Sequence, residues 1–223
     1  MQSRNFLGRY SLTYLLFWSV KRRFFLILSC VFRKMDFDTT DPVQAGDGVR
    51  RLWRAGEEYY VYQNEEYKGD VVGGNSASNI LDTASRYCSG SGVDVGCGGW
   101  PFPGAVGIDN ENELNAFNFG PHNNLDFVFS SHCLEHIADW QEALAHWISR
   151  LKIGGTLFLY LPHHDMLLWR PESPWVSGPG GHQWSPTFNV LEEFLKTLNT
   201  DIIAGEAEMD KHYSFYIVAR KKS

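Results

Sequence analysis

Cysteine is scarce in this sequence, and the cysteines present form no recognisable redox or metal-binding motif. Among the 223 residues, Cys30, Cys88, Cys97 and Cys133 make neither a C-x-x-C pair nor a spacing typical of metal ligands. We therefore predict reduced thiols, no disulfide and no metal site, as is usual for a cytoplasmic protein. Repeats and low-complexity tracts are also absent, and 43% hydrophobic with 21% charged residues is the composition of a globular domain.

Long apolar runs are missing as well, although the first 35 residues are rich in apolar side chains. The two longest runs there, residues 12–20 and 24–32, are separated by Lys21, Arg22 and Arg23. A membrane-spanning helix needs about 20 apolar residues. A cleavable signal peptide carries its charges before the apolar run and ends in an A-x-A-like site, and neither feature is present.

Acidic residues are absent from this leader, which contains seven Lys or Arg residues. We predict an interfacial helix, or a pair of helices, that contacts an anionic membrane surface through residues 1–35. The protein is then expected to be cytoplasmic and peripheral on the inner membrane surface. A helix packed on the domain and a natural start at Met35 are the alternatives.

Positive charge is scarce in the rest of the chain, where 13 basic residues stand against 26 acidic ones. A net charge of −13 on residues 36–223 would repel nucleic-acid phosphates. The sequence also lacks the N-P-P-[YF] tetrad that would serve a flipped base. We therefore predict no nucleic-acid partner.

Short apolar runs alternate with helical stretches and predict the fold class. Buried strands are expected at residues 92–96, 105–109, 125–130 and 156–161, and helices at 139–151 and 188–198. This alternation predicts an α/β fold of the Rossmann-like, doubly wound type with a mostly parallel sheet. Two further strands at 201–204 and 214–220 have no helix between them, so we expect an antiparallel C-terminal hairpin to close the sheet.

The chain is expected to have three parts. Residues 1–35 are the basic, apolar leader, and residues 36–75 are a polar lead-in segment or a helical lid. Residues 76–223 form the α/β domain, which is expected to begin with a helix that Ser76 or Ser78 caps and that runs to about Tyr87.

The most informative motif is a glycine-rich turn after the first strand of the α/β domain. The sequence D-V-G-C-G-G occupies residues 94–99, and G-I-D follows at 107–109, where the next strand ends. Glycines let a ligand approach the backbone, and a carboxylate can accept hydrogen bonds from both ribose hydroxyls. Pro101 stands where a dinucleotide site needs a third glycine, which disfavours a pyrophosphate ligand and a nicotinamide-dependent oxidoreductase. A phosphate-free nucleoside ligand remains.

These motifs resemble those of class I S-adenosylmethionine-dependent methyltransferases. Residues 94–99 with 107–109 are similar to motif I and its partner, residues 125–136 to the fourth strand and its loop, and residues 151–157 to the L-K-P-G-G-x-L turn. The resemblance covers residues 76–220. It implies S-adenosyl-L-methionine as cofactor and in-line methyl transfer to an oxygen or nitrogen atom. The expected acceptor is a small molecule or a glycan, and a lipid-linked precursor would fit the membrane contact predicted for residues 1–35.

The resemblance also implies the cofactor-binding residues. Asp94 would meet the methionine amino group, Asp109 the ribose hydroxyls, and Asn118, on a short third strand at 114–119, the adenine. The remaining contacts would come from the glycine-rich turn and the turn after the fourth strand: Gly96, Cys97, Gly98, Ser130, Ser131 and His132.

A general base is needed only where an oxygen or an unactivated nitrogen must lose a proton. The candidate bases are His132, His136 and His163, with Glu135, His164, Asp165, His182 and Trp184 as further polar residues at the same predicted edge of the sheet. Trp169, Trp175 and Trp184 would either stack on an acceptor or pin their loop. A non-catalytic S-adenosylmethionine-binding or regulatory module is the alternative to an enzyme.

Overall fold

The computed structural model describes residues 41–42, 48–69, 75–109 and 114–223. The chain divides into two compact units, a small one that contains Arg50–Gly69 and a larger one that contains the residues from 75 onward. The basic leader lies outside the described residues, so its membrane contact stays a prediction. Within the described residues, no helix has the length and apolar character needed to cross a membrane.

The small unit is an antiparallel sheet of sequential strands, β1 (Asp41–Pro42), β2 (Arg50–Arg54), β3 (Glu57–Tyr62) and β4 (Glu65–Lys68). Its two hairpin turns have positive φ at both central residues, at Ala55 and Gly56 and again at Gln63 and Asn64, which is the type I′ geometry that suits tight hairpins. The helical lid expected between residues 36 and 75 is therefore wrong for residues 50–68. Their aromatic and β-branched side chains favour strands.

The larger unit is built on a six-stranded sheet in the order β6-β5-β7-β8-β10-β9. The strands are β5 (Gly92–Val95), β6 (Ala105–Ile108), β7 (Leu125–Ser131), β8 (Leu151–Pro162), β9 (Thr200–Glu206) and β10 (Ser214–Lys221). Strands β6, β5, β7 and β8 pair in parallel, and β10 pairs antiparallel with both β8 and β9. The predicted Rossmann-like sheet with its closing hairpin is confirmed.

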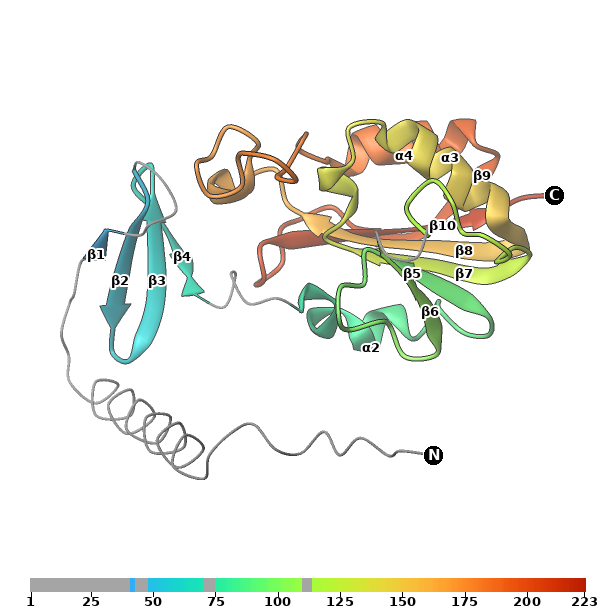
Figure 1. Cartoon of the computed structure of the whole chain (residues 1–223), viewed down its shortest axis with the longest axis horizontal. Coiled ribbons are helices and arrows are strands. Elements are labelled where there is room, and N and C mark those ends of the chain that lie inside the picture. Colours follow the sequence, from blue (N-terminus) through green and yellow to red (C-terminus); the bar gives the residue numbers. More distant parts are fainter. Residues whose placement is uncertain (1–40, 43–47, 70–74, 110–113) are drawn as a thin grey trace, which may run out of the picture. The chain divides into compact units, whose positions relative to one another are not determined.

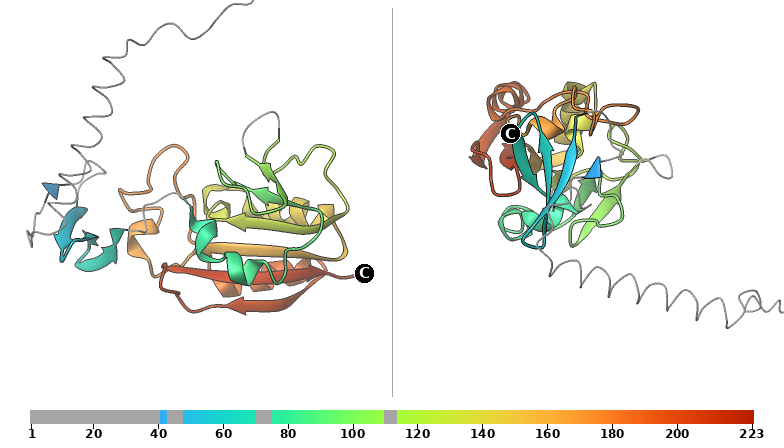
Figure 2. Two further views of the ribbon diagram at one scale, coloured as in Figure 1. Left: turned by 90° about the horizontal axis from the view of Figure 1, so that it is seen from below. Right: turned by 90° about the vertical axis from the view of Figure 1, so that its left-hand side faces the viewer.

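Helices cover both faces of this sheet (Figures 1 and 2). Helices α3 (Trp140–Arg150) and α4 (Phe188–Thr197) pack on one face, and the 3₁₀ helix η2 (Ser76–Asn79) with α2 (Leu81–Ala84) lies on the other. Side chains along β7 point alternately to the two faces of the sheet and so contribute to a hydrophobic core on each face. Val128 packs under α3 and α4, whereas Phe127 and Phe129 pack on the opposite side. Two short 3₁₀ helices, η3 (Leu134–His136) and η4 (Leu167–Trp169), lie in the loops after β7 and β8.

The structure departs from the expected elements in two places. The helix after residue 75 is shorter than expected, and its start is capped by Asn75, whose side chain accepts a hydrogen bond from the Ser78 amide, not by Ser76 or Ser78. Residues 96–104 form turns, in agreement with the sequence, because they are too few for a crossover helix with its loops. The third strand at 114–119 is wrong, since only Asn115 and Asn118 pair there, in an isolated bridge.

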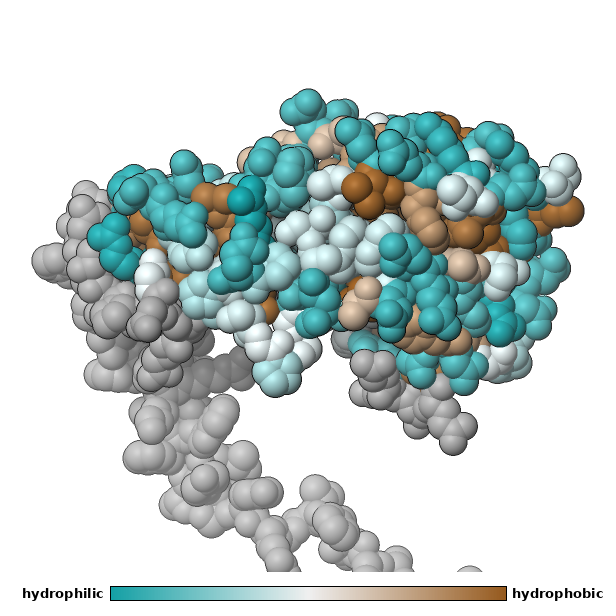
Figure 3. All heavy atoms as spheres, turned by 90° about the horizontal axis from the view of Figure 1, so that it is seen from above, coloured by the Kyte–Doolittle hydropathy of each residue, from teal (hydrophilic) through white to brown (hydrophobic). Residues whose placement is uncertain are grey.

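The surface of the larger unit gives little sign of a wide apolar docking face. On the face in Figure 3, hydrophobic residues form separate small groups among hydrophilic ones. The exposed large hydrophobic side chains of the described residues are scattered: Trp100, Val106, Phe117, Ile153, Val190 and Met209. Trp100 and Phe117 both border cavities at the carboxyl edge of the parallel strands, and that edge is where a ligand is expected.

Candidate functional site

Two cavities meet at the carboxyl ends of β5, β6 and β7. The larger has a volume of about 710 Å³ and the smaller about 130 Å³, and Gly96, Gly98 and His132 line both. The larger is also bordered by Asp109, Asn115, Ala116, Phe117, Cys133 and His136. The smaller is also bordered by Asn75, Ser76, Asp94, Cys97, Trp100 and Ser131.

The two glycines of the turn have different physical roles. Gly96 (φ 77°) packs against Cys133, because a Cβ on Gly96 would fall within 2.4 Å of that side chain. Gly98 (φ 53°) instead leaves open space, since a Cβ added there would have the Trp100 side chain, at 4.0 Å, as its nearest neighbour. Gly98 therefore offers bare backbone to a ligand, whereas Gly96 permits close packing of β5 against the loop after β7.

Two carboxylates flank the turn. The Gly98 amide donates a 2.8 Å hydrogen bond to Asp109 Oδ2, which ties the end of β6 to the turn. Asp94 is buried on β5 and accepts a 2.7 Å hydrogen bond from the Phe102 amide. Burial raises the pKa of Asp94 to about 6, although the Phe102 hydrogen bond opposes the shift.

The turn after β7 brings further predicted residues to the cavities. Ser130 is buried and its hydroxyl donates to the Val95 carbonyl oxygen at 2.8 Å, so it holds β7 to β5. The hydroxyls of Ser131 and Ser76 are 2.7 Å apart, which links this turn to η2. His132 has a left-handed backbone (φ 49°) and lines both cavities.

Two predicted site residues lie elsewhere. Asn118 does not line either cavity; its side chain accepts a hydrogen bond from the Gly120 amide, and Asn115 borders the larger cavity instead. His163, a candidate base, also lines neither cavity, and its Nδ1 accepts a hydrogen bond from the Asp165 amide at 3.1 Å. The predictions of adenine contact by Asn118 and of a base at His163 therefore do not fit this geometry.

Comparison with known families identifies the domain that carries this site. A family model described as "Methyltransferase domain" matches residues 59–159, which include the glycine-rich turn, Asp109 and the loop after β7. This match confirms the resemblance to class I S-adenosylmethionine-dependent methyltransferases that the sequence motifs predict. A comparison with curated proteins gave no match.

Solved structures share the methyltransferase fold at low sequence identity. A chain from the complex between the Haloferax volcanii Trm112 methyltransferase activator and a methyltransferase is 15% identical, with a TM-score of 0.51, and the match covers 67% of this chain and 90% of that one. A Thermotoga maritima protein described as a SAM-dependent methyltransferase and possible histamine N-methyltransferase is 15% identical, with a TM-score of 0.50, and the match covers 66% of this chain and 90% of that one.

S-adenosyl-L-methionine is the cofactor of this methyltransferase domain, and the geometry fits it. Gly98 leaves room for a ligand at the backbone, and Asp109 stands at the wall of the larger cavity. Asp94 borders the smaller cavity, where its carboxylate would face the positively charged amino group of the cofactor's methionine end. Each cavity is thus bordered by one carboxylate, as the predicted contacts to the methionine part and to the ribose require.

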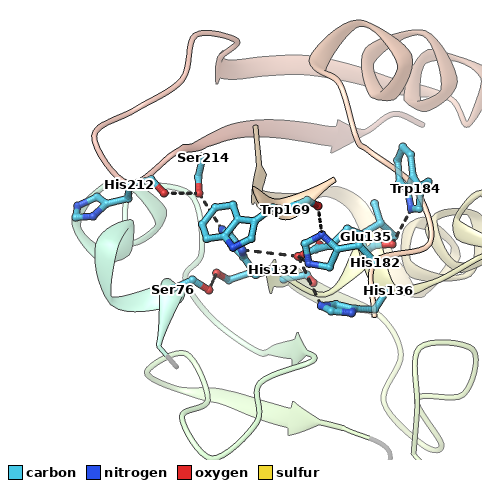
Figure 4. A network of polar contacts seen from close by, with 12 residues as sticks. Ser76, His132, Glu135, His136, Trp169, His182, Trp184, His212 and Ser214 are labelled. Carbon is cyan, nitrogen blue, oxygen red and sulfur yellow. Dashed lines mark hydrogen bonds and ion pairs between the residues drawn. The ribbon is translucent and has the colours of Figure 1, made fainter. Parts of the chain in front are cut away.

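A cluster of three histidines surrounds Glu135 beside the larger cavity (Figure 4). Glu135 Oε1 lies 3.7 Å from His132 Nδ1, 3.9 Å from His136 Nε2 and 3.8 Å from His182 Nε2. Burial raises the pKa of Glu135 to about 8, and burial together with neighbouring imidazoles lowers the pKa of His132 to about 3 and that of His182 to about 4.

The loop after β8 is pinned in place by its aromatic side chains. Trp184 stacks on Trp140 at 4.4 Å between ring centroids and donates a 2.9 Å hydrogen bond to the Leu134 carbonyl oxygen. Trp169 meets the His132 ring edge-on at 5.0 Å. These contacts explain how His182, which is 47 positions beyond Glu135 in the chain, reaches the same cluster.

Sequence reasoning missed Ser214 and the backbone groups that orient the imidazoles. Ser214 Oγ is 2.8 Å from His132 Nε2, although the two residues are 82 positions apart. The carbonyl oxygens of Gly180 and Trp169 bond to His136 and His182. No motif could have revealed these contacts, because backbone carbonyls carry no sequence signal and the loops meet only in the folded chain.

Proposed function

We propose that this protein transfers the methyl group of S-adenosyl-L-methionine to an oxygen or nitrogen atom of a small molecule or of a glycan or lipid-linked precursor. The single observation that carries the proposal is that the cofactor turn and the His132 imidazole line the same cavities. The cofactor supplies a methyl group activated by a positive sulfur. The protein must then align an acceptor and exclude water.

His132 is the residue best suited to take a proton from the acceptor. Its low pKa keeps the ring neutral at pH 7, so a nitrogen lone pair is available. The Ser214 hydroxyl donates to the His212 carbonyl oxygen at 3.1 Å, and it therefore accepts the N–H of His132 Nε2. This hydrogen bond leaves the lone pair on Nδ1, beside Glu135.

Cofactor binding is tested first, by calorimetry with S-adenosyl-L-methionine. Asp109→Ala should weaken binding about 10- to 150-fold, since hydrogen bonds to a charged group contribute about 1.5–3 kcal/mol. Asp109→Asn keeps an acceptor oxygen and should lose less. Asp201→Ala is the matched control, because Asp201 is exposed, pairs with Lys222 at 2.7 Å and lines neither cavity. Absence of binding by the unaltered protein would remove the proposal.

Turnover is tested second, by measuring formation of the demethylated cofactor with panels of phenols, amines, sugars and lipid-linked sugars. His132→Asn should lower kcat about 10²- to 10⁴-fold for an oxygen acceptor and should affect cofactor affinity much less. Asparagine suits this position because it tolerates a left-handed backbone. His164→Ala, in the exposed loop after β8, is the control. Binding without turnover of any acceptor would favour a non-catalytic cofactor-binding module.

For localisation, we propose that the protein acts in the cytoplasm at an anionic membrane surface. Seven basic residues without any acidic one in residues 1–35 support this proposal. Flotation with anionic liposomes should recover the full chain but not a chain that lacks residues 1–35, and raised salt should reduce recovery. Equal recovery of the two chains would contradict the proposal.

A further inference from the structure

Glu135 is a buried residue whose carboxyl group makes no hydrogen bond in the described part of the chain. Its side chain is fully buried in the 3₁₀ helix after β7, and neither carboxylate oxygen has a hydrogen-bond partner within the described part of the chain. Leaving a buried polar group unsatisfied costs about 1–3 kcal/mol, and more when the group is charged. A side chain retained in this state calls for an occupant that the protein chain itself does not supply.

The histidines around Glu135 are held with their lone pairs toward it. His136 Nδ1 contacts the Gly180 carbonyl oxygen at 2.8 Å, and His182 Nδ1 contacts the Trp169 carbonyl oxygen at 2.5 Å. A carbonyl oxygen only accepts hydrogen bonds, so both Nδ1 atoms carry the hydrogen and both Nε2 atoms are unprotonated in the neutral rings. Both Nε2 atoms face Glu135 Oε1 (Figure 4).

An arrangement of nitrogen lone pairs around a carboxyl oxygen is repulsive unless a proton or a metal cation lies between them, and separations of 3.8 and 3.9 Å are too long for a hydrogen bond through a shared proton. The donors on Glu135, His136 and His182 all lie within 4.8 Å of one another. In a tetrahedral zinc site with bonds of about 2.0–2.2 Å, neighbouring ligand atoms are about 3.4 Å apart. The observed separations of 3.8 and 3.9 Å from Oε1 need only a small inward movement of each side chain.

The outer hydrogen bonds also match a metal centre. A histidine that binds a metal almost always donates its other ring N–H to a carbonyl or carboxylate, which fixes the tautomer. His136 and His182 both do so. In the group His163, His164 and Asp165, by contrast, the His163 Nδ1 lone pair is already taken by the Asp165 amide, and Asp165 is exposed.

We propose that Glu135 Oε1, His136 Nε2 and His182 Nε2 bind a divalent transition-metal ion of the zinc class. Two imidazoles and one carboxylate favour such an ion over Mg²⁺ or Ca²⁺, which prefer oxygen ligands. Three protein ligands leave a fourth position open. Because His132 and His136 line the larger cavity, that position lies next to the cofactor and acceptor space. The inference reverses the sequence-based prediction of no metal site and goes beyond the proposed methyl transfer.

The test is zinc binding by the full chain after removal of metals with a chelator. Competition with a chromophoric zinc chelator should give one bound Zn²⁺ per chain, and Mg²⁺ in excess should not displace it. Glu135→Gln keeps the shape of the side chain and should weaken zinc binding at least about 100-fold, more than the loss typical of outer-shell changes. His136→Ala removes a ligand that is already partly exposed, so it tests the site at the smallest cost to the fold.

Asp165→Asn is the matched control, because it alters the neighbouring histidine and aspartate group without touching the proposed ligands. It should leave zinc affinity unchanged. Circular dichroism and thermal unfolding without metal establish that each variant is folded. The proposal would be overturned if the unaltered protein bound no zinc. It would also be overturned if Glu135→Gln bound zinc as tightly as the unaltered protein. These readouts use the metal alone, so they stand apart from any failure of methyl transfer.

Discussion

The two glycines of the cofactor turn allow a matched pair of substitutions whose effects should differ for a structural reason. Both have a left-handed backbone, where a Cβ costs about 1–2 kcal/mol. At Gly96 the added Cβ would also lie 2.4 Å from Cys133, and such overpacking costs about 1–3 kcal/mol more. Gly96→Ala should therefore destabilise the fold by about 2–5 kcal/mol and Gly98→Ala by about 1–2 kcal/mol.

Chemical and thermal unfolding of the two variants measures this difference. For a chain of this size each kcal/mol lowers Tm by about 2–4 °C, so the melting point of Gly96→Ala should fall about 4–20 °C. Gly98→Ala should instead act mainly on cofactor affinity, since its methyl group would enter the space beside the cavity. A Gly96→Ala variant as stable as Gly98→Ala would refute the packing role assigned to Gly96.

Three further outcomes follow from single contacts. Burial raises the pKa of Asp94 to about 6, so protonated Asp94 stabilises the fold below about pH 4, and this contribution is lost as the pH rises through 6. Between pH 4 and pH 7 the free energy of unfolding, measured in urea, should therefore fall about 1–3 kcal/mol less in Asp94→Asn than in the unaltered protein. Thr187→Ala should cost about 1 kcal/mol, because Thr187 caps α4, whereas Asp139→Ala should not, as its side chain makes no cap bond to α3. Trp184→Phe should cost about 0.5–1.5 kcal/mol by removing one of the two hydrogen bonds to the Leu134 carbonyl oxygen, which keeps the Ile137 amide as a donor, and thermal unfolding measures this loss.

The central sheet could be predicted because β5, β7 and most of β8 are buried on both faces, whereas the edge strand β6 is partly exposed. Continuous apolar runs at residues 92–96, 105–109 and 125–130 became β5, β6 and β7 with shifts of one residue at their ends. Helices α3 and α4 were predictable from apolar residues at helical spacing. The hydrophobic pattern predicts these elements because the same apolar residues are buried in the folded protein.

The small unit and the expected third strand show where periodicity fails. Strand β3 contains Tyr59, Tyr60, Val61 and Tyr62, a run that favours a strand, but its polar neighbours suggested a lid. Residues 114–119 look apolar enough for a strand, yet Asn115 and Asn118 accept hydrogen bonds from backbone amides two positions on. Such asparagine turns compete with strand pairing and cannot be weighed from the pattern alone.

The cofactor side of the site was accessible from the sequence because its residues are close together along the chain and belong to one turn and two strand ends. The cluster around Glu135 was only partly accessible. Glu135 and His136 were noted as polar residues after β7, and His182 as part of the long loop, but nothing in their spacing places them within 4.8 Å of one another. That proximity depends on a loop whose path is set by the stacking of Trp184 on Trp140.

The backbone conformation of His132 explains why the cofactor cavities and the cluster around Glu135 lie next to each other. Its φ of 49° is unusual for a residue other than glycine and costs about 1 kcal/mol. The hydrogen bond of its amide to the Tyr160 carbonyl oxygen, at 2.9 Å, and that of its ring to Ser214, at 2.8 Å, hold the residue in this conformation. An extended residue at this position would continue β7 and direct the ring elsewhere. The left-handed turn instead sets the imidazole between the cofactor cavities and Glu135, so the geometry that binds the cofactor also orients the cluster beside it.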